Sequence, residues 1–485
     1  MPPTSRRPAR AAIVIAAACS SVLAACGNAS TPVSARQSAV RSSSNDVAFK
    51  NCASNCTGEI DGAKYRIALP SKWNGTLLLY SHGYRFASPI PAEPGSAVQT
   101  NAQVSSTDAD GSASDPLSRK LLGEGYALAG SSYKSNGWAV ADGVDAGVAL
   151  HKKFVELVGN PKRTYVWGDS LGGLITEILA EENPSWVDGS APMCGVLAGP
   201  NMNFDLALDV AFLIKALIDP SLKLTNYASA DEANQNWVSA AALVKKAAAD
   251  LAGGGTAAIL YIAALVGAPA KTQTYDGHDI VSQVKATVDA LLTALAFGTS
   301  GRYEVEQRVG GNPSDNTKAD YVSRLTPKEN LTITALHGDI GSFEQKINTL
   351  PRVHADAAAR TAFEKLGDTT GDLHVPTVTM HTEDDPLVLV QNETVFDQRA
   401  EQRGEAARLV QTFIAPPATY SESSGAPYGA GHCNFSDQQR VGLVNVLDNW
   451  ARRSAYPGTG AIASAFGAGY DPQFVPGPWP GSGQS

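Results

Sequence analysis

A short apolar strand that runs straight into a glycine-flanked serine constrains this chain more than any other feature. Residues 165–167 are apolar, Gly168-Asp169-Ser170-Leu171-Gly172 follows, and the amphipathic run from Leu174 to Glu182 predicts a helix behind it. A serine on so sharp a turn is held in a strained backbone conformation that lifts its hydroxyl clear of the sheet. Neither flanking glycine carries a side chain that could collide with the neighbouring strand and helix. The stretch therefore predicts a strand–turn–helix unit with Ser170 at its tip.

G-x-S-x-G between a strand and a helix is the context of a nucleophile elbow. The N-terminus of the following helix directs N–H groups and a positive dipole end toward the place where an oxyanion would form. With 45 glycines in the chain, however, the pentapeptide can also arise by chance. The interpretation therefore depends on what surrounds Ser170.

Strand and helix patterns alternate on both sides of the elbow. This spacing indicates a parallel sheet with right-handed crossovers, hence an α/β fold. The first two strands, separated by Pro70 and by Asn74-Gly75, form a hairpin-like pair. The expected strands are 64–69, 76–80, 125–132, 163–167, 188–193, 375–381 and 409–414, and the expected helices of this part are 139–158, 392–403 and 437–450.

Chain order selects partners for the serine. In α/β-hydrolases the triad residues follow the order Ser, Asp, His. The strong strand 375–381 leads into Asp384-Asp385-Pro386, which points to Asp385 as the acid, with Asp384 as its rival. Of the eight histidines only His432 comes after Asp385, and it lies between the last expected strand and the C-terminal helix. Ser170, Asp385 and His432 are therefore the predicted catalytic residues.

A second turn predicts the oxyanion hole. The strand 76–80 ends in Ser81-His82-Gly83-Tyr84, and a His-Gly pair in this position starts the loop that supplies one oxyanion N–H in α/β-hydrolases. We expect the backbone N–H groups of Tyr84 and Leu171 to bind the oxyanion. The alternative is an ordinary strand-ending turn with a structural histidine.

On these residues, the chain resembles exported actinobacterial α/β-hydrolases of the esterase kind, with a large helical cap inserted into a mostly parallel sheet. The resemblance implies a hydrolase core over 49–198 and 368–455, a cap over 199–367 and a Pro/Gly-rich tail over 456–485. A separate helical domain is the alternative for the insertion. Its expected helical segments are 206–218, 230–252, 256–265, 281–297, 302–308, 319–324 and 360–366, broken by the linkers 253–255 and 299–301.

Two other families share single features with the chain. Gly-Asp-Ser-Leu at 168–171 also occurs in GDSL hydrolases, but those place it near the start of the domain and use a C-terminal Asp-x-x-His, which this chain lacks. The His432-Cys433 pair is similar to that of fungal tannases and feruloyl esterases, in which the second cysteine stands beside the serine. Here Asp169 precedes Ser170, so the chain departs from that pattern.

The first 26 residues match a bacterial lipoprotein signal peptide. Three arginines precede the short apolar run 11–18, and Leu23-Ala24-Ala25-Cys26 matches the lipobox in which the cysteine is lipidated. The alternative is ordinary signal cleavage at an Ala-x-Ala-like site. Residues 27–48, rich in Ser, Ala and Asn, read as a flexible tether. We therefore expect an exported protein, anchored to the membrane through its N-terminal lipid or secreted.

The net charge of the chain without its signal peptide limits the kinds of molecule that it can bind. Removal of the signal leaves 35 basic residues against 47 acidic ones, a net charge of −12, which argues against nucleic acid or an anionic surface as a partner.

Four cysteines remain outside the signal, and three pairings are possible. Cys52 and Cys56 are close enough for a local loop, which leaves Cys194 with Cys433. No nearby His or second pair completes a metal site at 52–56.

The predicted function is hydrolysis of a small-molecule or polymeric carboxylic ester through an acyl-enzyme, with no cofactor. A secreted aminopeptidase on the same fold is the main alternative, and a non-catalytic binding lipoprotein is a lesser one. An aminopeptidase would need carboxylates that hold the substrate amine. The acidic residues Asp142, Asp145, Glu181 and Glu182 are expected instead to be solvated helix faces.

Overall fold

The computed structural model describes residues 51–89, 115–271, 280–417 and 430–481. These residues belong to one compact unit, Val47–Ser485. The predicted signal peptide, lipobox and tether all fall outside the described residues. Among the helices of the described part, none is long and apolar enough to cross a membrane.

An eight-stranded sheet forms the centre of the fold, with the order β1-β2-β4-β3-β5-β6-β7-β8. β2 runs antiparallel to β1 and β4, and all other neighbours are parallel. This strand order, with a sharp serine turn after β5, is that of the α/β-hydrolase sheet. The chain has the α/β-hydrolase fold. Its strands are β1 (Asn55–Ile60), β2 (Ala63–Ala68), β3 (Thr76–Ser81), β4 (Ala127–Ser131), β5 (Arg163–Asp169), β6 (Gly189–Met193), β7 (Thr377–Thr382) and β8 (Leu409–Ile414).

The expected hairpin between the first two predicted strands is wrong. Both strands form, as β2 and β3, but β4 lies between them and pairs with each. Gly75 does turn the chain, with φ of 92°. β2 instead makes its hairpin with β1, a strand that the sequence pattern did not indicate.

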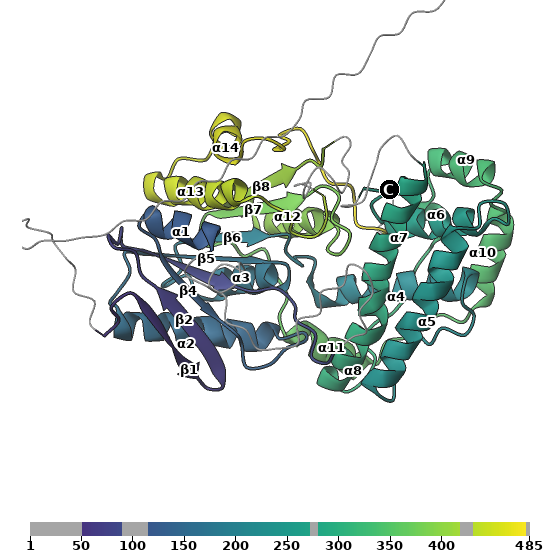
Figure 1. Cartoon of the computed structure of the whole chain (residues 1–485), viewed down its shortest axis with the longest axis horizontal. Helices are drawn as coiled ribbons and strands as arrows, with labels where there is room; N and C mark the ends of the chain where they lie inside the picture. The colour runs from purple at the N-terminus through teal and green to yellow at the C-terminus, as the bar shows by residue number, and fades with distance from the viewer. Residues whose placement is uncertain (1–50, 90–114, 272–279, 418–429, 482–485) are drawn as a thin grey trace, which may run out of the picture. The chain divides into compact units, whose positions relative to one another are not determined.

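Helices cover both faces of the sheet because successive strand side chains point to opposite faces. Leu77 and Leu79 of β3 pack in a core cluster with residues of α2 and α3, whereas Leu78 and Tyr80 pack in another with residues of α1 and α13. Figure 1 shows α1 and α13 on one side of the sheet and α2 on the other. The bounds are α1 (Pro116–Gly123), α2 (Val140–Leu157), α3 (Leu171–Glu182), α12 (Gln391–Arg403) and α13 (Asp437–Arg453), with a 3-10 turn η3 (Ala406–Arg408) before β8.

Between β6 and β7 the described chain is helical and contributes no strand to the sheet. Helices α4 to α11, which we call the cap, have a core of their own around Trp237, Tyr261 and Phe212. The cap comprises α4 (Gly199–Leu217), α5 (Ala230–Ala248), α6 (Gly255–Val266), α7 (Ile280–Ala296), η1 (Phe297–Gly301), α8 (Arg302–Val309), η2 (Val322–Arg324), α9 (Pro327–Ala335), α10 (Ile340–Thr349) and α11 (Ala357–Lys365).

Two sequence expectations outside the sheet are also corrected. The linker expected at 299–301 does not break the helix, because η1 is a π-helical turn that joins α7 to α8. Thr299 Oγ1 donates to the Leu295 carbonyl and Arg302 Nε donates to the Gly298 carbonyl, which satisfies the widened turn. In the tail, expected to be irregular, residues Thr459–Phe466 form α14, whose Ile462 and Phe466 are buried in the core cluster that contains α13.

Candidate active site

Ser170 sits on a strained turn between β5 and α3. Its φ of 60° and ψ of −123° are unfavourable for a residue with a side chain, and α3 begins at the next residue. The flanking glycines are required sterically. A Cβ at Gly168 would lie 2.4 Å from the Ser81 carbonyl oxygen, and one at Gly172 would lie 2.1 Å from the same atom. This is the backbone geometry of a nucleophile elbow.

The three residues predicted from chain order lie together. His432 Nε2 is 2.8 Å from Ser170 Oγ, and His432 Nδ1 is 2.9 Å from Asp385 Oδ2. The elements that place them are the elbow after β5, the turn after β7 and the segment before α13. His432 is therefore within hydrogen-bond distance of Ser170 through one ring nitrogen and of Asp385 through the other, which is the arrangement of a Ser-His-Asp triad.

Asp385, rather than Asp384, faces His432. Asp385 Oδ1 accepts hydrogen bonds of 2.9 Å from the backbone N–H groups of Leu387 and Val388. Asp384 is directed elsewhere, because its carboxylate pairs with Lys271 of the cap at 3.8 Å. Of the two candidate acids, the structure brings only Asp385 to the histidine.

The environment of Asp385 favours its charged form. Complete burial by itself would raise the pKa of this carboxyl. Three neighbours outweigh burial and lower the pKa of Asp385 below its usual value. They are His432, through its charge and its hydrogen bond, then His381, through its charge, and the Leu387 N–H, through a hydrogen bond. An ionised acid is what holds the histidine in the tautomer that presents a lone pair to the serine.

The His82-Gly83 turn lies against the nucleophile. A Cβ at Gly83 would come within 3.2 Å of Ser170 Cβ, so the glycine backbone borders the serine side chain. The His82 ring stacks on Tyr133 at 3.8 Å and is buried. Burial and the nearby Arg85 lower the pKa of His82 to about 3, so this ring is neutral and structural.

Leu171 is the first residue of α3, where a backbone N–H lacks an intrahelical acceptor. The roles of Tyr84 and Leu171 as oxyanion donors stay predictions.

Both disulfides of the described chain follow the expected pairing. Cys52 bonds Cys56, and Cys194 bonds Cys433 over a separation of 239 residues. Cys194 follows β6 and Cys433 follows the base, so the second bridge ties the His432 segment to the end of the sheet. Asp385 and His432 have ligand atoms within 4.8 Å of both sulfurs. Because the sulfurs are bonded to each other, they offer no thiolate ligand, and we assign no metal there.

Cap residues lie next to the site, and the sequence did not indicate which ones. Phe297 of η1 packs on Tyr84 with ring centroids 5.0 Å apart, and Phe86 completes an aromatic trio with both. Ala286 of α7 packs on Ala430, two residues before His432. Only the fold brings Phe297 to Tyr84 and Ala286 to Ala430, since the residues of each of these pairs are far apart in sequence.

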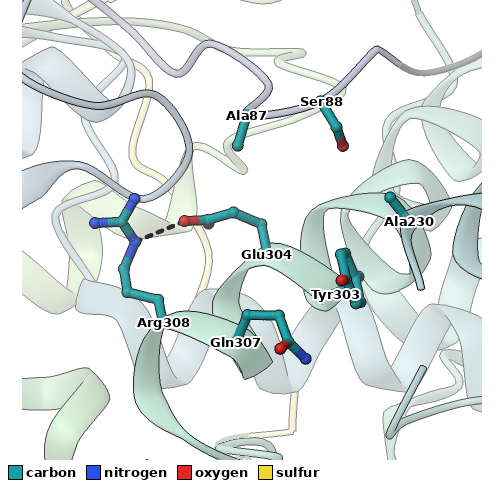
Figure 2. A pocket seen from close by; sticks show the side chains of 7 residues that line it. All are labelled: Ala87, Ser88, Ala230, Tyr303, Glu304, Gln307 and Arg308. Carbon is teal, nitrogen blue, oxygen red and sulfur yellow. Dashed lines mark hydrogen bonds and ion pairs between the residues drawn. The ribbon is translucent and has the colours of Figure 1, made fainter. Parts of the chain in front are cut away.

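A cavity of about 450 Å³ lies between α8 and the segment 87–88. Figure 2 shows Glu304 and Arg308 side by side on α8, joined by an ion pair, with Ala87 and Ser88 opposite. The lining contains no triad residue. It lies next to the aromatic trio, because Ala87 of its lining directly follows Phe86. Burial and the charge of Glu304 raise the pKa of the Tyr84 hydroxyl. The cavity thus borders the aromatic trio rather than the reacting groups.

The four acidic residues weighed as amine ligands do not line the triad. Asp145 and Glu182 are exposed. Glu181 accepts hydrogen bonds from Thr370 and Gly371 and so anchors a loop. Asp142 bonds Ser135. The expectation of solvated helix faces is met for two of them, and the other two have structural partners.

No family model matches the chain, and no curated protein matches it either. Among solved structures it is similar to feruloyl esterase B from Aspergillus oryzae, with 14% identity over 83% of this chain and 80% of that one and a TM-score of 0.37. An esterase from Aspergillus oryzae shares 15% identity over 81% of this chain and 78% of that one, with a TM-score of 0.36. Proline iminopeptidase from Mycobacterium smegmatis shares 12% identity over 83% of this chain and 100% of that one, also with a TM-score of 0.36. Likeness of this extent carries no argument about the reaction.

Proposed function

We propose that the chain is a serine hydrolase that cleaves carboxylic esters through Ser170, His432 and Asp385. The observation that carries this proposal is the pair of hydrogen bonds made by His432, whose Nε2 accepts from the Ser170 hydroxyl at 2.8 Å and whose Nδ1 donates to Asp385 at 2.9 Å. The strained backbone of Ser170 supports it, because such strain is stored at sites that use it.

The chemistry follows from these groups. His432 Nε2 takes the proton of Ser170 Oγ as that oxygen bonds the acyl carbon. Asp385 stabilises the imidazolium that results. The proton then passes from His432 to the leaving alkoxide, which departs as an alcohol. Water next attacks the acyl-enzyme while His432 takes its proton, and His432 returns that proton to Ser170 Oγ as the acid is released. Each backbone N–H of the predicted oxyanion hole would contribute about 3 kcal/mol to the transition state.

An ester with an aryl or other flat apolar group is the substrate class that the surroundings favour. Tyr84, Phe86 and Phe297 gather three rings next to the turn that borders Ser170. Rings of this kind stack on aromatic groups and gain free energy beyond the area they bury. Phenolic esters and aromatic polyesters both present such groups.

An aminopeptidase is the second candidate, and one observation favours it. Glu383 and Asp384 directly precede the triad acid, and burial followed by the charge of Asp471 raises the pKa of Glu383 to about 7. A substrate ammonium placed beside these carboxyls would lower that pKa again and pair with their ionised form. Lys271 already pairs with Asp384, which offsets part of this charge. We therefore place the ester reaction first.

We also propose that the protein works outside the cytoplasm. Two disulfides in the described chain suit an oxidising compartment. The predicted lipobox at Cys26 supplies the means of attachment. Mass spectrometry of the mature protein tests this, since a diacylated Cys26 as the first residue supports the anchor and an unmodified N-terminus contradicts it.

A substrate panel tests the proposed reaction. Wild type and Ser170→Ala are compared on p-nitrophenyl acyl esters, aryl esters of increasing ring size and aminoacyl p-nitroanilides. Ester turnover that disappears in Ser170→Ala supports the proposal, and turnover of anilides alone would transfer it to the aminopeptidase. A fluorophosphonate probe that fails to label Ser170 would instead favour a non-catalytic lipoprotein.

A further inference from the structure

A second, buried histidine lies next to the proposed triad acid. His381 lies on β7, and its Nε2 is 3.7 Å from Asp385 Oδ2. Its Nδ1 is 3.2 Å from Glu393 Oε1 of α12, and its Nε2 is 2.8 Å from the Val388 carbonyl oxygen. The side chains of His381, Asp385 and Glu393 are 0% exposed. Such a buried ionisable group, which the triad chemistry does not use, requires an explanation.

Both ring nitrogens of His381 face acceptors. A neutral imidazole has one N–H and one lone pair, so it can satisfy only one of these two oxygens. Glu393 is itself an acceptor, because its Oε2 receives hydrogen bonds from Thr379 Oγ1 at 2.6 Å and Gln411 Nε2 at 2.8 Å. Only the imidazolium donates to both Glu393 and the Val388 carbonyl. Because His82 also faces two acceptors, the number of acceptors alone does not distinguish His381. Its two carboxylate neighbours do, with Glu393 Oε1 at 3.2 Å and Asp385 Oδ2 at 3.7 Å, and they favour a buried cation.

The surrounding charges agree with this protonation state. Burial alone would lower the pKa of His381, but the hydrogen bond to Glu393 and the negative charges of Glu393 and Asp385 outweigh burial and raise it. His82 provides the contrast, because it faces two carbonyl oxygens and no carboxylate. Glu177 of α3 is the further acid near Glu393, and burial, followed by the charge of Glu181, raises its pKa to about 8.

We propose that His381 is a positioning residue of the proposed triad, held as an imidazolium by Glu393, and that it offsets part of the negative charge that Asp385 presents to His432. This inference rests on the proposed function. His381 also fixes the Asp385 turn, because the Val388 residue whose carbonyl it binds donates its own N–H to Asp385 Oδ1. Glu393 acts through His381 and does not contact His432.

The sign of the effect follows from Coulomb attraction. The charge of His381 competes with His432 for the carboxylate of Asp385. Without it, Asp385 stabilises the imidazolium form of His432 more strongly, and His432 keeps its proton to a higher pH. Because the acid limb of kcat/KM reports the base of the free enzyme, that limb then moves to higher pH.

The test compares wild type with His381→Gln, Glu393→Gln and the double variant. Gln at 381 can retain the donor to Val388 but carries no charge. The pH profile of kcat/KM on a p-nitrophenyl ester is expected to shift its acid limb upward by about one unit in His381→Gln. Glu393→Gln shifts it in the same direction, because the buried His381 without its counterion loses its proton and with it the charge that competes with His432. The double variant adds little beyond His381→Gln. His151→Asn is the matched control, since His151 stacks on Trp186 of the described chain, is half-buried and leaves the limb in place.

A lower kcat with an unmoved acid limb in both single variants would reduce His381 to a structural residue and overturn the proposal. Imidazole NMR of the wild type reports the protonation state of His381 directly, without substrate or variant. Two ring N–H signals from His381 at pH 7 support the proposal, and a neutral ring overturns it, even if the variants fail to fold. Because this readout needs no turnover, loss of the ester reaction would refute the proposed function separately.

Discussion

The guanidinium of Arg440 lies 2.7 Å from the carboxylate of Asp169, the residue that precedes the proposed nucleophile. The other terminal nitrogen of Arg440 donates to the carbonyl oxygen of Cys433, the residue that follows the proposed base, at 3.2 Å. One side chain of α13 therefore joins the elbow to the base segment. Asp169 also accepts a hydrogen bond from Tyr80, and its side chain is only 2% exposed.

Arg440→Met is expected to destabilise the protein by about 3 kcal/mol, because it leaves the Asp169 carboxylate buried without its cation. Urea unfolding measures this change. Asp169→Asn in the same background should recover most of the loss, since the uncompensated charge is then gone. Arg452→Met on the same helix is the control, because Arg452 is exposed where it pairs with Asp448, so its removal should leave the stability nearly unchanged. Equal stability of Arg440→Met and wild type would contradict this role.

Asp385→Asn is expected to reduce kcat by about 10⁴-fold, because an amide cannot hold His432 in the tautomer that accepts the serine proton. Asp384→Asn should stay within a few-fold of wild type, since its partner is Lys271 rather than His432. Steady-state kinetics on one ester substrate compares the two. The reverse result would exchange their roles and show that Asp384 is the acid.

Chain order and local pattern predicted the site better than the sheet around it. His432 could be selected because it is the only histidine after Asp385, and the glycines around Ser170 encode a steric requirement that the structure shows directly. Strand neighbours depend on contacts between distant segments, which local pattern does not contain. The Asn74-Gly75 turn therefore suggested a hairpin, although β4 pairs between the two strands.

The supporting residues were less predictable than the reacting ones. Arg440 is 271 residues from Asp169, and no spacing rule relates them. His381 precedes Asp385 by four residues, but its meaning depends on Glu393 from the following helix. The π-helical turn at η1 was hidden because Thr299, Ser300 and Gly301 are typical of a linker, and the hydrogen bonds from Thr299 and Arg302 that support the helical segment depend on its folded geometry.

The Cys194–Cys433 bridge is expected to matter for both stability and activity. In the chain-entropy model, a loop of this length is stabilised by up to about 5 kcal/mol and the short Cys52–Cys56 loop by about 2 kcal/mol. Cys194→Ser/Cys433→Ser should lower the melting temperature and also lower kcat, because Cys433 adjoins His432. Cys52→Ser/Cys56→Ser is the control that should keep kcat. If both pairs leave kcat unchanged under conditions where the variants are folded, the bridge does not hold the base.

Glu177 is expected to make the protein less stable as the pH rises. The side chain is fully buried on α3, where one carboxyl oxygen accepts from Ser190 Oγ at 2.8 Å and the other has no partner. Burial, followed by the charge of Glu181, raises the pKa of Glu177 from 4.5 to about 8. Between these two values the folded state keeps a proton that the unfolded state has released, so the free energy of unfolding falls with rising pH and levels off above about pH 8.

Glu177→Gln cannot ionise, so between pH 5 and pH 8.5 its free energy of unfolding should fall by at least about 1 kcal/mol less than that of wild type. Urea unfolding at both pH values measures the difference, and Glu182→Gln, at an exposed position of the same helix, should follow the wild type. Parallel pH dependences of Glu177→Gln and wild type would show that this carboxyl is ionised in the folded protein at neutral pH.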